Sequence, residues 1–134
     1  MPQNPPIIAG TRIGHVHLKV ADLDRAIAFY TRSLDFHVVV QAGPVATIAR
    51  GALHLLLSGT ASSGARAMPG GAQQSPGGWN RIVLYVDDLD AAIAPLEKAS
   101  VHFRNAVESG PGGRQILLDD PDGNPIELHE APKR

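Results

Sequence analysis

The chain contains an internal repeat, and this repeat limits the possible folds more than any other feature of the sequence. Residues 20–28 match residues 86–94 at seven of nine positions when the sequence is shifted by 66 positions. A chain of 134 residues has the size of one domain and is too short for two unrelated domains with separate cores. The repeat therefore predicts a single domain built from two copies of one unit.

Each copy begins with a strand that leads directly into a helix. Apolar residues alternate with polar ones and then meet an aspartate, which is the pattern of a half-buried strand followed by a helix N-cap. Apolar residues at helical spacing follow this aspartate in both copies. Pro95 lies inside the second predicted helix, where it removes a backbone donor, so we expect that helix to be kinked or shortened. The alternating residues are Val16, Leu18 and Val20 in the first copy and Ile82, Leu84 and Val86 in the second.

Three further strands follow each helix, so each copy is predicted to be a βαβββ module and the fold class to be α+β. Two such modules, paired side by side, would form a cupped mixed sheet with the helices outside. We expect an N-terminal arm over residues 1–11 and one domain over residues 12–130. Within the domain, module one covers 12–58, a linker rich in Gly, Ser, Ala and Pro covers 59–78, and module two covers 79–130. The elements predicted in module two are a helix at 88–99 and strands at 79–87, 101–107, 114–119 and 125–130.

The overall composition excludes several classes of function. The net charge is −1 with both signs mixed, which gives no reason to expect a nucleic-acid or anionic-membrane partner. No apolar run approaches the ~18 residues of a membrane span, and the first residues lack the pattern of a signal peptide. The chain has no cysteine, which excludes disulfides and thiolate chemistry. We therefore expect a soluble cytoplasmic protein.

The alternation of side chains across a strand places several polar residues on the face opposite the helices. If Val16, Leu18 and Val20 pack under the first helix, His15, His17 and Lys19 point to the other face. The corresponding residues of module two are Arg81, Val83 and Tyr85, and the last strands add His54, Glu127 and His129. His37 and His102 fall outside this set and are predicted to be ordinary surface residues. Trp79 and Tyr85 are expected to contribute to packing, with a platform for substrate as the alternative.

Pairing of the modules would bring His15, His54, Arg81 and Glu127 together on the cupped face. Two imidazoles and a carboxylate form a ligand set that Fe(II), Mn, Ni or Zn accepts while leaving positions open for substrate. We place His15, His54 and Glu127 at symmetry-equivalent positions of the repeat, which favours a shared role in the cleft. The alternative for each histidine is a hydrogen-bonded structural residue of a strand.

With these residues, the chain resembles the vicinal oxygen chelate superfamily, which includes glyoxalase I, extradiol dioxygenases, and fosfomycin- and bleomycin-resistance proteins. Two motifs carry the resemblance: IGHVHLKVADLDRAIAFY at the start of module one and GPGGRQILLDDPDGNPIELHE at the end of module two. The resemblance implies a metal site drawn from the first and last strands of each module. In this sequence those positions are His15, His54, Arg81 and Glu127, and metal-dependent members usually have histidine where this chain has Arg81.

Two classes of function follow from the resemblance, because the same scaffold serves different reactions. The first is a lyase, isomerase or dioxygenase in which His15, His54 and Glu127 hold a divalent ion that chelates substrate oxygens, with Glu127 and Arg81 as the catalytic residues. The second is a metal-free protein of the bleomycin-resistance type that binds or sequesters a small ligand. Arg81 cannot be a metal ligand, because guanidinium does not lose its proton. It would either pair with Glu127 in a metal-free cleft or orient an anionic group of the substrate. We expect a homodimer in both cases.

Overall fold

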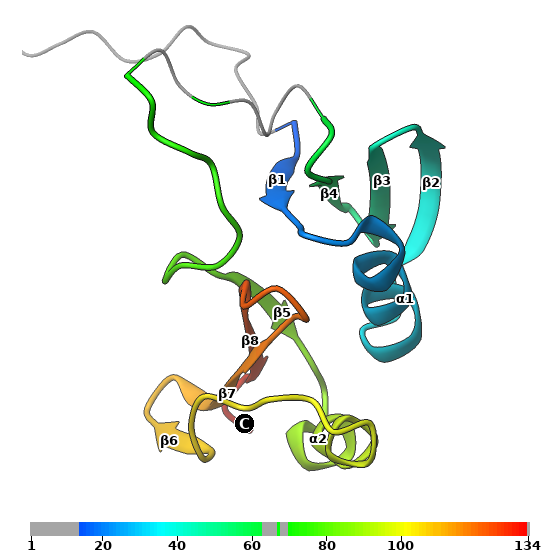
Figure 1. The fold of residues 1–134 in the computed structure, drawn as a ribbon. Helices are drawn as coiled ribbons and strands as arrows, with labels where there is room; N and C mark the ends of the chain where they lie inside the picture. The colour runs from blue at the N-terminus through cyan, green and yellow to red at the C-terminus, as the bar shows by residue number, and fades with distance from the viewer. Residues whose placement is uncertain (1–13, 63–66, 68–69, 134) are drawn as a thin grey trace, which may run out of the picture.

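The computed structural model describes residues 14–62, 67 and 70–133 and contains two βαβββ modules in tandem (Figure 1). Module one forms a four-stranded mixed sheet with strand order β1-β4-β3-β2, in which β1 pairs parallel to β4 and the other neighbours are antiparallel. Its elements are β1 (Val16–Lys19), α1 (Leu23–Ser33), β2 (His37–Ala42), β3 (Val45–Arg50) and β4 (Leu53–Ser58).

Module two repeats this topology with strand order β5-β8-β7-β6, and β5 is parallel to β8. The predicted fold class and the two tandem modules are therefore confirmed. No helix among the described residues has the length and apolar character needed to cross a membrane. The elements of module two are β5 (Ile82–Tyr85), α2 (Leu89–Lys98), β6 (Glu108–Gly110), β7 (Gly113–Asp119) and β8 (Pro125–Glu130).

The aspartates of the repeat start both helices, as their positions predict. The Asp22 side chain accepts a hydrogen bond from Arg25 N at 3.0 Å, and Asp88 accepts one from Ala91 N at 3.1 Å. Each aspartate satisfies one of the amide donors that the first turn of a helix leaves unpaired. Pro95 lies within α2, and the helix ends three residues later at Lys98.

The strand predicted at residues 101–107 is wrong. Only Phe103 forms an isolated bridge there, with Leu118, and the third strand of module two is instead the short β6 at Glu108–Gly110. A side chain takes the place of a backbone carbonyl as the acceptor for β7, because Asn105 Oδ1 accepts the hydrogen bond from Leu117 N at 2.9 Å. Asparagine competes in this way with regular strand pairing, which the apolar alternation alone does not reveal. The predicted arm at residues 1–11 lies outside the described residues, as do parts of the linker.

One hydrophobic cluster includes residues from both modules. In each module the helix covers one face of the sheet and leaves the other face open, so the strand residues under the helix are buried. Burial of a single large aliphatic side chain contributes roughly 1.5–3 kcal/mol, which makes this shared cluster the main source of stability. Its residues include Val20, Tyr30, Ile48, Leu55 and Leu57 from module one and Leu84, Leu89, Leu118, Ile126 and Leu128 from module two.

Polar contacts also join the modules through the turn between β7 and β8. Tyr30 Oη donates to Asp120 Oδ2 at 3.0 Å across a separation of 90 residues, and Asn124 Nδ2 donates to the Lys19 carbonyl at 3.0 Å. Arg25 forms an ion pair with Asp122 on the same turn. Strands β1 and β5 end their respective sheets, and no ladder in the described residues joins one sheet to the other. The modules are thus held together by the core and by this turn.

Candidate functional site

The strand register corrects the symmetry expected for His54. Val16 lies beside Leu55 in module one, and its repeat counterpart Ile82 lies beside Ile126 in module two. The residue that corresponds to Glu127 is therefore Leu56, and His54 lies two positions earlier. The expectation that His54 and Glu127 occupy equivalent places is wrong, because spacing in the sequence does not reveal how long the intervening hairpins are.

Arg81 and Glu127 are brought together on the open face of module two. Arg81 Nε donates to Glu127 Oε1 at 2.8 Å, although the two residues are 46 positions apart. The Glu127 side chain is 7% exposed and that of Arg81 is 40% exposed. A carboxylate so deeply buried requires a partner, since the desolvation of an unpaired charge costs several kcal/mol. Arg81 supplies that partner from the residue that precedes β5.

Two other side chains contact the same carboxylate. His129 Nδ1 lies 3.2 Å from Glu127 Oε2. The Gln115 amide, oriented with its nitrogen toward Glu127, donates to both oxygens at 3.1 and 2.9 Å. His129 Nε2 also lies 2.9 Å from the Gly112 carbonyl, and this carbonyl together with Glu127 raises the pKa of His129. Glu127 is consequently enclosed by donors from the residue before β5, from β7 and from β8.

The predicted histidine ligands lie elsewhere. His15 and His54 are exposed, and His54 Nδ1 lies 3.2 Å from the Ala52 carbonyl. Within the described residues, no group of three or more His, Cys, Asp or Glu side chains is arranged to hold a metal ion. The donors of a single chain, with Glu127 already bound to Arg81, therefore do not fit the divalent-metal site that the resemblance implies. A metal at His15, His54 and Glu127 remains a prediction.

The other histidines are exposed or partly buried. His37 is exposed as predicted, but its pairing with Ala49 places it on the open face of module one, in the same row as His54. His102 Nδ1 lies 2.8 Å from Asp119 Oδ2 on an exposed surface. Burial and the neighbouring Lys19 and His15 lower the pKa of His17.

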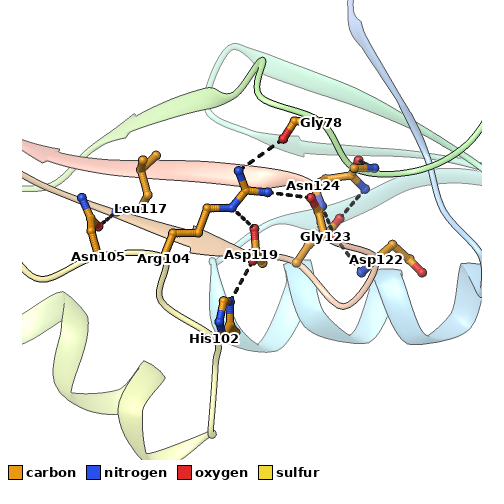
Figure 2. Close-up of polar contacts among 11 residues, drawn as sticks. Gly78, His102, Arg104, Asn105, Leu117, Asp119, Asp122, Gly123 and Asn124 are labelled. Atoms are coloured by element: carbon orange, nitrogen blue, oxygen red, sulfur yellow. Dashed lines mark hydrogen bonds and ion pairs between the residues drawn. The ribbon is translucent and has the colours of Figure 1, made fainter.

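A cavity of about 370 Å³ lies where the edge of β1 faces the start of β5. Its wall also includes the end of the linker and the start of β8, and neither segment was predicted to belong to a functional site. Arg104 holds this wall in place: its side chain binds Asp119 and donates to the carbonyls of Gly78 and Gly123 at 3.2 and 3.1 Å (Figure 2). The cavity is lined by Val16, His17, Leu18, Lys19, Ser75, Gly77, Asn80, Arg81, Ile82, Asn124 and Pro125.

The two aromatic residues of this region are exposed, so the expectation that they contribute to packing is wrong. Trp79 is 80% exposed and its ring lies 5.0 Å from the Arg104 guanidinium, within cation–π range. Tyr85 is 72% exposed and meets the His129 ring edge-to-face at 5.6 Å. Tyr85 therefore offers aromatic surface next to His129, which contacts Glu127, whereas Trp79 lies against Arg104.

This architecture, two βαβββ modules that each have a helix on one face of a four-stranded sheet, defines a two-module scaffold. Residues 12–128 match the family described as the Glyoxalase/Bleomycin resistance protein/Dioxygenase superfamily. The chain belongs to this superfamily. A comparison with curated proteins found no match.

Solved structures of different function resemble the chain over nearly its whole length. TnmS3, an antibiotic-binding protein from Streptomyces sp. CB03234, is 26% identical with a TM-score of 0.72, and the match covers 93% of this chain and 99% of that one. Lactoylglutathione lyase from Agrobacterium tumefaciens is 26% identical with a TM-score of 0.70, covering 92% and 96%. The fosfomycin-resistance protein FosX from Listeria monocytogenes, at 16% identity, a TM-score of 0.71 and coverage of 91% and 94%, shares the fold. The scaffold thus serves both binding proteins and enzymes.

Proposed function

We propose that the protein binds a small organic molecule without a metal ion, in the manner of a sequestering protein such as antibiotic-binding TnmS3. The observation that carries this proposal is the pairing of Glu127 with Arg81 at 2.8 Å. Glu127 is the only carboxylate among the predicted ligands, and its oxygens are occupied by Arg81, His129 and Gln115. A metal ion would have to displace these donors.

Displacement of the donors is unfavourable for electrostatic reasons. A guanidinium about 5 Å from a divalent ion repels it by roughly 7 kcal/mol at an effective dielectric constant near 20, an upper bound because the side chain can move away. Moving Arg81 away would in turn leave it without its carboxylate partner. An organic ligand encounters neither cost, because it can bind the terminal nitrogens of Arg81 while Nε stays bound to Glu127.

A metal-dependent lyase, isomerase or dioxygenase is the second candidate, and one observation favours it. His15 and His54 are exposed on module one and Glu127 lies on module two, so this candidate requires a cleft between module one of one copy and module two of another. The likeness to lactoylglutathione lyase agrees with this candidate. It requires that Arg81 release Glu127.

The two candidates differ in their response to a chelator. Removal of divalent ions is expected to leave ligand affinity and thermal stability unchanged if the site is metal-independent. A fall in both quantities that a divalent ion reverses would support the metal-dependent candidate instead.

We also propose that the protein forms a homodimer. Within the described residues, β2 pairs only with β3 and β6 only with β7, and Val38, Val39 and Val40 of β2 are exposed, so each sheet has an edge away from the cavity that a second copy can cover. Size-exclusion chromatography with light scattering at micromolar concentration is expected to give the mass of two chains. A single species with the mass of one chain would contradict this prediction.

A further inference from the structure

The cavity between β1 and β5 has a one-sided charge. Three basic side chains line it, those of His17, Lys19 and Arg81, and no acidic residue does. The protein as a whole carries a net charge of −1, so this concentration of basic groups is local. A concave surface of one sign concentrates the opposite charge from solution.

Lys19 is a free cation on this wall. In the part of the chain that the structure describes, no carboxylate lies within ion-pair distance of Lys19. The polar side-chain neighbour is His17, whose Nε2 lies 3.4 Å from the Lys19 ammonium. The Lys19 carbonyl is fixed by Asn124 Nδ2 at 3.0 Å, which anchors the lysine backbone beside the cavity. The ammonium therefore has donors available for an anion.

Arg81 adds further donors to the same cavity. Its Nε is used by Glu127, whereas its two terminal nitrogens have no hydrogen-bond partner in the described part of the chain. Glu127 thus fixes the orientation of the guanidinium plane and leaves the two terminal nitrogens of Arg81 available to a ligand. A guanidinium held in this way matches the two oxygens of a carboxylate.

The rest of the wall is apolar. Val16, Leu18, Ile82 and Pro125 line the cavity, and its volume of about 370 Å³ lies within the range typical of small-molecule sites. Such a wall accommodates a hydrocarbon or aromatic body, while the basic side chains hold a charged end. A small inorganic anion would leave this apolar surface exposed to water.

We propose that the cavity is a binding site for an organic carboxylate, with the carboxylate held by Lys19 and Arg81 and the apolar body packed against β1 and β5. This inference rests on the proposed function, since it names the class of ligand that the protein binds. His17, which lies beside Lys19 and His15 and shares the cavity with Arg81, adds a pH dependence, because a bound anion favours its protonated form. Affinity for a carboxylate therefore rises as the pH falls.

Phenylacetate is a suitable probe, because it joins a carboxylate to an aromatic ring, and phenylacetamide is its neutral counterpart of similar shape. Titration of the full chain, followed by two-dimensional amide NMR, is expected to shift the signals of Gly77 and Asn124 with phenylacetate. Lys19→Gln should weaken phenylacetate about tenfold, the loss of one charge-assisted hydrogen bond. Lys98→Gln, an exposed lysine at the end of α2, is the matched control and should bind as the wild type does.

Three results would overturn the proposal for a folded protein. They are equal affinity for phenylacetate and phenylacetamide, equal affinity of the Lys19→Gln and Lys98→Gln variants, and no shift of cavity signals at millimolar phenylacetate. The proposed function fails on a different result, a requirement for a divalent ion. Metal-dependent binding that still responds to Lys19→Gln would therefore refute metal independence and leave the carboxylate site intact.

Discussion

Arg81→His is expected to create a binding site for Ni²⁺ or Zn²⁺ on the open face of module two. Arg81 Nε lies 2.8 Å from Glu127 Oε1, and the Nε2 of a histidine is separated from its Cα by the same number of bonds as Arg81 Nε. Neighbouring ligand atoms of a metal ion are about 3 Å apart when each bond is about 2.1 Å. The new imidazole, Glu127 and His129 would then form a set of two nitrogens and one carboxylate.

The expected gain is about 100-fold or more in affinity, because a ligand is added and a permanent positive charge is removed. Calorimetry near pH 7.5 measures it, with chelator-treated wild type as the reference. Arg32→His is the matched control, since Arg32 is exposed on α1 and its loss changes the composition in the same way. Glu127→Gln in the Arg81→His background should remove the gain. Equal metal binding by wild type and Arg81→His would mean that Arg81 and Glu127 do not share a site.

Asp120→Ala is expected to lower the free energy of unfolding by about 4 kcal/mol, because several buried hydrogen bonds are lost together. The Asp120 carboxylate accepts from Tyr30 Oη, from the amides of Asp122 and Asn124, and from Asn124 Nδ2, at 2.8 to 3.0 Å. These bonds hold the turn that joins the modules. Tyr30→Phe removes one of them and should cost about 1 kcal/mol. Denaturant unfolding of both variants, with exposed Asp87→Ala as control, measures the difference. A cost within error of that control would contradict the structural role of Asp120.

The pH dependence of this effect has a defined sign. Burial raises the pKa of Asp120, against the opposing influence of its hydrogen bonds from Asn124, Asp122 and Tyr30. A raised pKa in the folded state gives a stability contribution that is complete below the ordinary aspartate value of about 4 and is lost as the pH rises through the raised value. The stability of the wild type relative to Asp120→Asn should therefore fall as the pH increases from about 4.

The parts of the fold that could be predicted from the sequence are those set by local pattern. The strands β1 and β5 and the helix caps at Asp22 and Asp88 are determined by residues close in sequence. The repeat shows the same pattern of strand and cap twice, which strengthens the prediction for each copy. The segment at 101–107 has the same alternation but no ladder, because Asn105 hydrogen-bonds to β7 through its side chain. The local pattern of apolar residues could not distinguish a strand with a ladder, such as β1, from a segment without one.

The site was less accessible to sequence reasoning, because its contacts are long-range. The alternation of side chains predicted that Arg81 and Glu127 lie on the open face of the sheet. Their pairing was one of the two alternatives predicted for Arg81. The register that separates His54 from the position equivalent to Glu127 depends on hairpin geometry. The cavity wall formed by Gly77 and Asn124 depends on a linker and a turn that carry no periodic signal.

The most direct test of metal-independent binding is the affinity of the wild-type protein for phenylacetate before and after treatment with EDTA. Metal-independent binding predicts the same dissociation constant in both samples, and the same value again after addition of Ni²⁺, Zn²⁺ or Mn²⁺. Loss of binding after EDTA, recovery with one of these ions, and no recovery in Glu127→Gln would contradict it.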